Sequence, residues 1–275
     1  MGIIDNTKVG ETAQTELGYG GNIPVVENFD ACVSKKPDTL VIGSASQGGF
    51  ISDEFRVDII KAIESGCDII SGMHHFLNDD KEIKDLAKKH NVKKVVLTSS
   101  VAAIFETKES KSYYDESDWS DPESKTISHY SKSKTLAEKA AWEFIEKEDH
   151  PFELAVINPA LVIGPSLSGD LGESNKAIVM VATGKMPVAV PLQFGYVDVR
   201  DVATAHILAM QNPASNGERF ALAEKDLWYK DVAKVLKSNG FDKAPTFAVP
   251  VWLAKILANF SKELKITLPY LGRLR

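Results

Sequence analysis

A tyrosine and a lysine in this sequence lie at the spacing of one helical turn. Tyr130 and Lys134 are four residues apart near the start of an amphipathic stretch that predicts a helix over 128–147. On a helix, both side chains would point the same way. A nearby ammonium lowers the pKa of a tyrosine from about 10, so the pair predicts a proton donor or acceptor near neutral pH. The same spacing occurs on many helices as a solvated pair, so its meaning depends on the residues around it.

Two predicted strands, over 94–98 and 152–158, end in residues that can contact a ligand. These candidates for substrate or cofactor contact are Thr98, Ser99, Ser100, Asn158 and Pro159. In a parallel sheet, ligands bind beyond the carboxyl ends of the strands. A hydroxyl there, such as that of Ser100, would donate to a substrate carbonyl and stabilise a developing alkoxide. The alternative is an ordinary loop start or helix N-cap. Together with Tyr130 and Lys134, however, these residues converge on one edge of one sheet and predict a ligand site.

Short apolar runs alternate with helix-length amphipathic stretches over the first two thirds of the chain. We expect strands over 1–5, 22–26, 39–43, 67–71, 94–98 and 152–158, and helices over 28–36, 52–65, 79–89 and 128–147. Continuous apolar strands separated by helices predict a parallel sheet covered on both faces. The fold class is therefore α/β, a doubly wound, Rossmann-like sheet.

After Pro165 this alternation loosens. We expect helices over 175–183, 198–210, 229–238 and 250–261, an extended piece over 186–191 and a short strand over 219–222. The predicted domains interleave: a Rossmann-like domain over 1–165 plus 195–222, and a small substrate lobe over 166–194 plus 223–275. The charged stretch over 106–118 is interpreted as an exposed loop, and the apolar stretch over 247–260 as core or the face of a homodimer.

Composition excludes several classes of protein. The chain has 275 residues, a net charge of −6 and 44% hydrophobic residues, which is typical of globular proteins. An acidic balance without a basic stripe argues against a nucleic-acid surface. The two cysteines, Cys32 and Cys67, do not make a disulfide framework. Without a signal peptide or a run of roughly 18 apolar residues, we expect a cytoplasmic protein that does not enter a membrane.

Five stretches carry a resemblance to a known family. They are VKKVVLTSSVAA (92–103), YDESDWSD (114–121), YSKSKTLAEKAAW (130–142), VINPALVIGP (156–165) and YVDVRDVATAH (196–206). From about Val92 to its end, the chain resembles the extended short-chain dehydrogenase/reductase superfamily in its dihydroflavonol-reductase-like, epimerase-like branch. The match covers about two thirds of the chain.

This resemblance implies a reaction and a role for each matching residue. Ser100 would orient and polarise a substrate carbonyl, Tyr130 would be the general acid, and Lys134 would hold the nicotinamide ribose and lower the pKa of the tyrosine. Asn158 and Pro159 would lie near the nicotinamide. The implied activity is an oxidoreductase reaction, the NADP(H)-linked reduction of a small-molecule ketone or aldehyde. The sequence does not choose between NADP(H) and NAD(H).

The opening of the chain departs from that family. It lacks the Gly-x-x-Gly-x-x-Gly turn whose backbone N–H groups would bind a pyrophosphate, and the glycines at 18–21 follow no apolar strand. The turn that holds Gly43, Gly48 and Gly49 could accept an anion and is the candidate for cofactor binding. A tight strand-to-helix loop with a capped helix is the equal alternative.

Residues 1 to about 91 carry a second resemblance, in IIDNTKVG (3–10), DTLVIGSASQGG (38–49) and ISGMHHFLNDD (70–80). They are similar to the Rossmann-like N-terminal region of a bacterial family related to D-glutamate N-acetyltransferases. The P-loop of that family is absent, so its nucleotide chemistry is not implied. We interpret the chain as a chimera joined near 90–93, with a substrate lobe that is truncated at 268–275.

Three hypotheses about function remain. The first is the carbonyl reductase. The second is a hybrid α/β scaffold that keeps Ser100, Tyr130 and Lys134 but binds its cofactor weakly or not at all. The third is a module that binds phosphate or carboxylate through the turn at Gly48 and Gly49. No metal site is predicted, because the histidines at 74–75 have no third ligand at a recognised spacing. His206 is interpreted as a packed or surface histidine.

Overall fold

The computed structural model describes residues 1–18, 20–42, 51–71, 81–90, 92–107, 111, 113–147, 152–166, 171–186, 188–260 and 265. The chain divides into two compact units. The first comprises Met1–Ser99, Ser133–Ile157 and Ala205–Phe220, and the second comprises Ser100–Lys132, Asn158–Thr204 and Ala221–Arg275. Both units interleave along the sequence. The domain boundaries expected from the sequence stay a prediction.

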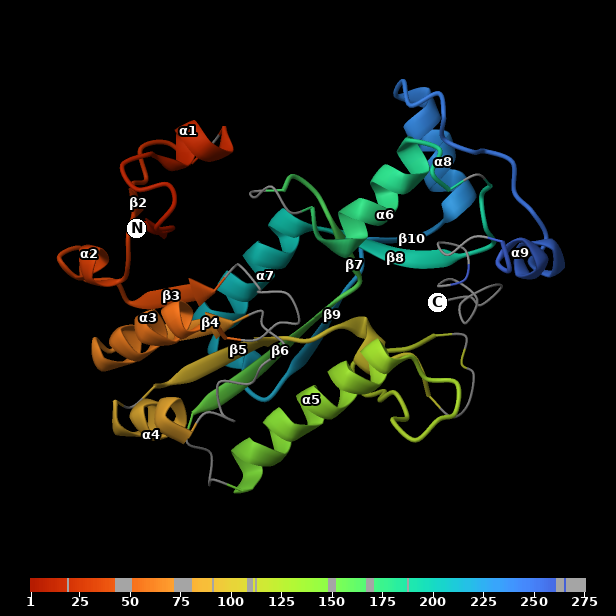
Figure 1. Ribbon diagram of the computed structural model, residues 1–275. Coiled ribbons are helices and arrows are strands. Elements are labelled where there is room, and N and C mark those ends of the chain that lie inside the picture. The colour runs from red at the N-terminus through yellow and green to blue at the C-terminus, as the bar shows by residue number, and fades with distance from the viewer. Residues whose placement is uncertain are drawn as a thin grey trace. The chain divides into compact units, whose positions relative to one another are not determined.

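A five-stranded sheet is the centre of the main α/β arrangement (Figure 1). In spatial order its strands are β3 (Thr39–Ile42), β4 (Asp68–Ser71), β5 (Lys94–Thr98), β6 (Glu153–Pro159) and β9 (Arg219–Leu222). The first four pair in parallel, and β6 holds the last through a hydrogen bond from the Val156 N–H to the Glu218 carbonyl (3.0 Å). The predicted Rossmann-like α/β fold is confirmed.

Apolar helix faces cover this sheet within the first unit. Helix α3 (Asp53–Glu64) begins at Ser52, whose side chain accepts a hydrogen bond from the Phe55 N–H (3.2 Å). Its buried face packs against β3 and β4, and α4 (Lys81–Lys89) packs against α3. The C-terminal part of α5 (His129–Lys147) buries Ala141 and Ile145 in a second cluster that contains residues of β6. Helix α5 therefore has a fixed position on the sheet.

The opening of the chain forms a small sheet of its own. Strand β1 (Ile3–Ile4) pairs in parallel with β2 (Val25–Val26). Between them lies α1 (Ala13–Leu17), which was not predicted; it is capped by Thr12 and ends at Gly18, where φ is +75°. The next helix, α2 (Asp30–Val33), is shorter than expected. The predicted first strand thus exists but lies outside the five-stranded sheet.

The second unit contains a three-stranded sheet that was not predicted. Its order is β10 (Lys225–Trp228), β8 (Gln193–Asp198) and β7 (Leu161–Ile163), with β8 antiparallel to β10 and parallel to β7. Helices α6 (Gly172–Ala182) and α8 (Tyr229–Ser238) pack beside it, and α9 (Val251–Leu257) joins the same apolar core. Helix α7 (Val199–Gln211) and the short helices η2 (Val101–Ala103) and η3 (Pro213–Ser215) complete the described elements.

Neither cysteine of the chain forms a disulfide. Cys32 and Cys67 are both buried, and Cys67 donates to the Pro37 carbonyl (3.2 Å). In the described part of the chain every helix is too short or too polar to cross a lipid bilayer.

The packing of α3 gives a first prediction. Ile59 is 1% exposed in the cluster that joins α3 to β4, whereas Val57 on the same helix is 50% exposed. Ile59→Ala leaves a cavity and should lower the free energy of unfolding by about 2–5 kcal/mol. Val57→Ala, the matched control, should change it by less than about 0.5 kcal/mol. Urea denaturation followed by circular dichroism measures both, and equal effects would mean that this face of α3 is not buried.

Candidate active site

Ser100 and Tyr130 are brought together in the second unit. Ser100 follows β5 in extended backbone geometry and caps η2 by accepting from the Ala102 N–H (3.1 Å). A hydrogen bond also joins its hydroxyl to the hydroxyl of Tyr130, in the first turn of α5. The N-cap alternative for Ser100 is therefore confirmed, and its catalytic role stays a prediction.

The end of β6 fixes the backbone around Ser100. Asn158 is fully buried, and its side-chain N–H donates to the Ser100 carbonyl (3.2 Å). The Pro159 carbonyl accepts from the Ser100 hydroxyl (3.5 Å). In this structure Asn158 and Pro159 thus hold the serine in place, and the position near a nicotinamide that the resemblance implies for them stays a prediction.

A second group of polar residues lies in the first unit, around the carboxyl end of β5. Lys134, one turn after Tyr130 on α5, is buried and donates from its Nζ to the Thr98 carbonyl (3.4 Å). The Thr98 hydroxyl is 2.6 Å from Nε2 of His206 on α7. Ser99 is buried, and its hydroxyl has no hydrogen-bond partner among the described residues. His206 is therefore packed, as expected, but against a predicted site residue.

Burial sets the pKa values of the two ionisable candidates. About half of the Tyr130 surface, 52%, is exposed, but the crowded surroundings of its hydroxyl raise the pKa more than the Ser100 hydrogen bond lowers it. The expected lowering of this pKa is therefore not found, since burial raises the pKa of Tyr130, and the role of Lys134 beside the tyrosine stays a prediction. Burial lowers the pKa of Lys134 to about 8, against the opposing charge of Glu138.

Buried polar side chains anchor the first turn of α5, and the sequence reading missed them. The Ser131 hydroxyl donates to Glu106 (2.7 Å) and accepts from the Ser128 hydroxyl (2.8 Å), while the Glu106 N–H donates to Ser120 (2.8 Å). Asp118 is also buried and pairs with Lys111. The interpretation of 106–118 as an exposed loop is therefore wrong at both ends: the Glu106 carboxylate accepts from a residue that is distant in sequence, and the Asp118 carboxylate pairs with Lys111 within the same stretch.

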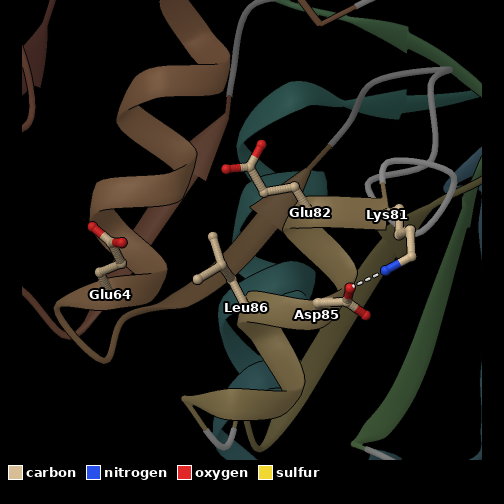
Figure 2. Close-up of a pocket in the computed structure, with 5 residues that line it drawn as sticks. All are labelled: Glu64, Lys81, Glu82, Asp85 and Leu86. Carbon is tan, nitrogen blue, oxygen red and sulfur yellow. Dashed lines mark hydrogen bonds and ion pairs between the residues drawn. The ribbon is translucent and has the colours of Figure 1, made fainter.

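Several predicted candidates cannot be placed. Gly43, Gly48 and Gly49 lie outside the described residues, as do the histidines at 74–75 and the end of the chain at 268–275. An open hollow of about 450 Å³ lies between α3 and α4, and Figure 2 shows the side chains around it. It is lined by Glu64, Lys81, Glu82, Asp85 and Leu86. No predicted site residue lines this hollow, and most of its lining residues are charged.

Two families match different parts of the chain. Residues 6–95 match a Rossmann-like domain of unknown function, and residues 73–223 match the NAD dependent epimerase/dehydratase family. The opening region thus resembles a Rossmann-like family, as predicted, and this family is not the one that the rest of the chain matches. The reductase-like resemblance of the remainder is confirmed as well.

Known reductases are similar to this chain. A cinnamoyl-CoA reductase of Medicago truncatula is 38% identical over 160 residues, 56% of this chain and 48% of the relative. An NADPH-dependent methylglyoxal reductase of Saccharomyces cerevisiae is 32% identical over 237 residues, 79% of this chain and 66% of the relative. The chain thus spans about half the length of the plant relative.

Solved structures show the same fold. The yeast methylglyoxal/isovaleraldehyde reductase in complex with NADPH is 25% identical, with a TM-score of 0.53 over 85% of this chain and 74% of the other. Vestitone reductase from alfalfa, 20% identical with a TM-score of 0.56 over 85% and 72% of the two chains, shows the fold alone. Since the family match extends over more than half of the sequence, this chain belongs to the NAD dependent epimerase/dehydratase family.

Proposed function

We propose that this chain reduces a ketone or an aldehyde by NADP(H)-linked hydride transfer, with Tyr130 as the general acid. The observation that carries the proposal is the hydrogen bond between Ser100 and Tyr130, at the start of the helix that holds buried Lys134 one turn later. The similarity to reductases named as NADPH-dependent supports the cofactor.

The residues at the end of β5 fit a nucleotide ribose. An ammonium has three N–H donors, and the contact described for Lys134 uses one, on the Thr98 carbonyl. The Ser99 hydroxyl is buried without a partner among the described residues, and such groups cost free energy unless a ligand satisfies them. Vicinal ribose hydroxyls both accept and donate hydrogen bonds. Lys134 and Ser99 would therefore hold this part of the cofactor.

The chain's own residues would supply the proton and the orientation of the substrate. A bound NADPH supplies the hydride for the carbonyl carbon. The raised pKa of Tyr130 keeps its phenol protonated at neutral pH, as a general acid requires. Ser100 would donate to the same carbonyl oxygen and stabilise the charge that develops there. As that oxygen becomes an alkoxide, Tyr130 gives up its proton and the product is an alcohol.

Lys134 would assist this proton transfer through its charge. Its pKa of about 8 leaves the ammonium mostly protonated at pH 7. A positive charge beside a phenol stabilises the phenolate that remains after the proton has left. In this structure Lys134 donates to Thr98, so its effect on the tyrosine would begin when a ribose occupies its remaining donors.

One observation favours a second candidate, the hybrid scaffold with weak or lost cofactor binding. Residues 6–95 match a different Rossmann-like domain, and we infer that this domain takes the place of the segment that would bind a pyrophosphate in the reductases. On this account the chain is a chimera with its junction near 90–93, just before β5, and Ser100, Tyr130 and Lys134 are retained without turnover.

Binding of NADPH distinguishes the two candidates. A ligand that binds only the native state stabilises it. The reductase should therefore unfold at a temperature a few degrees higher in saturating NADPH, about 2–4 °C for each kcal/mol. Differential scanning fluorimetry with NADPH, with NADH and without nucleotide measures this shift. An unchanged unfolding temperature in both nucleotides would favour the hybrid scaffold, and a larger shift with NADH would replace NADP(H) by NAD(H).

The role of Tyr130 has a direct test. Tyr130→Phe removes the proton donor and should lower kcat by about 10²–10⁴-fold, while the NADPH-induced rise in unfolding temperature remains. Tyr113→Phe, at a tyrosine that is 74% exposed, is the matched control and should retain full activity. NADPH oxidation with methylglyoxal and with aromatic aldehydes gives the rates. Undiminished turnover by Tyr130→Phe would remove this tyrosine from the mechanism.

The buried ammonium should cost stability, as groups retained for function often do. Because the pKa of Lys134 is about 8 in the folded chain and 10.5 in the unfolded chain, the unfolded state binds more protons between these values. Stability from this group therefore rises with pH through that window. Lys134→Met should be more stable than the natural chain at pH 7, by roughly 1–3 kcal/mol. Urea unfolding measures the difference, which should shrink as pH rises above 8; a constant difference would contradict the lowered pKa.

A further inference from the structure

Helix α5 carries a buried carboxylate one turn beyond Lys134. Glu138 is fully buried, and its carboxylate forms an ion pair with Arg219 at the start of β9. Arg219 and Glu138 lie in the first unit, as does Lys134. A buried carboxylate is costly unless it is paired. Packing alone therefore does not explain why this buried ion pair lies one turn from Lys134.

We propose that Glu138 is a positioning residue that keeps the Lys134 ammonium charged, and that Arg219 holds the Glu138 carboxylate in place for this purpose. Residues four apart on a helix are neighbours on its surface, and the interaction between two charges is strong where water is excluded. The proposal deepens the proposed function and depends on it for its catalytic meaning, but the ionisation of Lys134 can be measured without catalysis.

Burial and charge act on Lys134 in opposite directions. Burial lowers its pKa to about 8, and the Glu138 charge is the opposing influence. Without that carboxylate, the desolvation of the ammonium would be uncompensated and the Arg219 guanidinium would add repulsion. A neutral Lys134 could neither donate all three of its hydrogen bonds nor stabilise a phenolate.

The other elements around Lys134 supply groups that do not replace Glu138. Strand β5 offers the neutral Thr98 carbonyl, and α7 offers His206 behind the Thr98 hydroxyl. Protonation of His206 would oppose the charge on Lys134. Tyr130 precedes the lysine on α5, and β9 contributes the positive charge of Arg219. Among these groups, Glu138 is the one that carries a negative charge at neutral pH.

The test is the titration of Lys134 in the full chain without nucleotide. Carbon-13 labelling of lysine side chains and assignment with Lys134→Arg allow NMR to follow its Cε shift against pH. Glu138→Gln should lower the midpoint by at least one pH unit, and Glu138→Asp, which keeps the charge, should restore most of it. Glu143→Gln is the matched control, because Glu143 lies on the exposed side of α5 in a pair with Lys147. An unchanged midpoint in Glu138→Gln would overturn the proposal.

A second variant keeps the test decisive if Glu138→Gln does not fold. Glu138→Gln leaves Arg219 buried without its partner, which can be strongly destabilising. If it does not fold, Glu138→Gln combined with Arg219→Gln leaves no buried guanidinium without its partner, and the Lys134 midpoint should still fall below that of the natural chain. A midpoint equal to or above the natural one would overturn the proposal.

Activity separates this inference from the proposed function. If the natural chain reduces carbonyls, the alkaline limb of its kcat/KM–pH profile, which reports the free enzyme, should move down in Glu138→Gln by the same amount as the NMR midpoint. If the midpoint moves but the natural chain neither binds NADPH nor turns over, the electrostatic role of Glu138 stands and the reductase proposal fails.

Discussion

Five residue pairs, from Lys94 with Glu153 to Thr98 with Ile157, hold β5 parallel to β6. Because both strands end at the same edge, the residues that follow them meet: the Ser99 N–H donates to the Ile157 carbonyl (2.7 Å), and the Asn158 side chain donates to the Ser100 carbonyl (3.2 Å). A register shift of one residue would reverse which side chains face the core. The position of Ser100 is therefore a consequence of strand pairing.

Helix α5 adds charge to this arrangement at some cost. Lys134 and Glu138 lie on successive turns and are both buried, as are the polar Ser131 and Thr135 next to them. The apolar contacts of Ala141 and Ile145 with the sheet hold the helix while its earlier turns carry these groups. The C-terminal part of α5 thus packs against the sheet, and the turns before it carry the buried ionisable groups.

Much of the fold followed from the sequence, and the exceptions have physical reasons. Valine-rich β5 was predicted with its observed bounds, since a continuous apolar run in a parallel sheet is distinctive. Strand β8 was missed, because its residues Gln193–Asp198 mix polar, aromatic and glycine positions in a partly covered sheet. Glu106 was misplaced at the surface, because its partners Ser120 and Ser131 are distant in sequence. For the site, the spacing of Tyr130 and Lys134 indicated the residues but not the direction of the tyrosine pKa, which depends on burial.

The pairing of β1 with β2 keeps the opening of the chain outside the five-stranded sheet. The backbone hydrogen bonds described for residues 3–26 outside regular helices close within that segment, as when Ile3 donates to the Pro24 carbonyl (3.0 Å) and Val25 to the Glu11 carbonyl (2.8 Å). Among the described residues, residues 3–26 contribute no strand to the five-stranded sheet. Loss or replacement of residues 3–26 would therefore remove no strand from the five-stranded sheet.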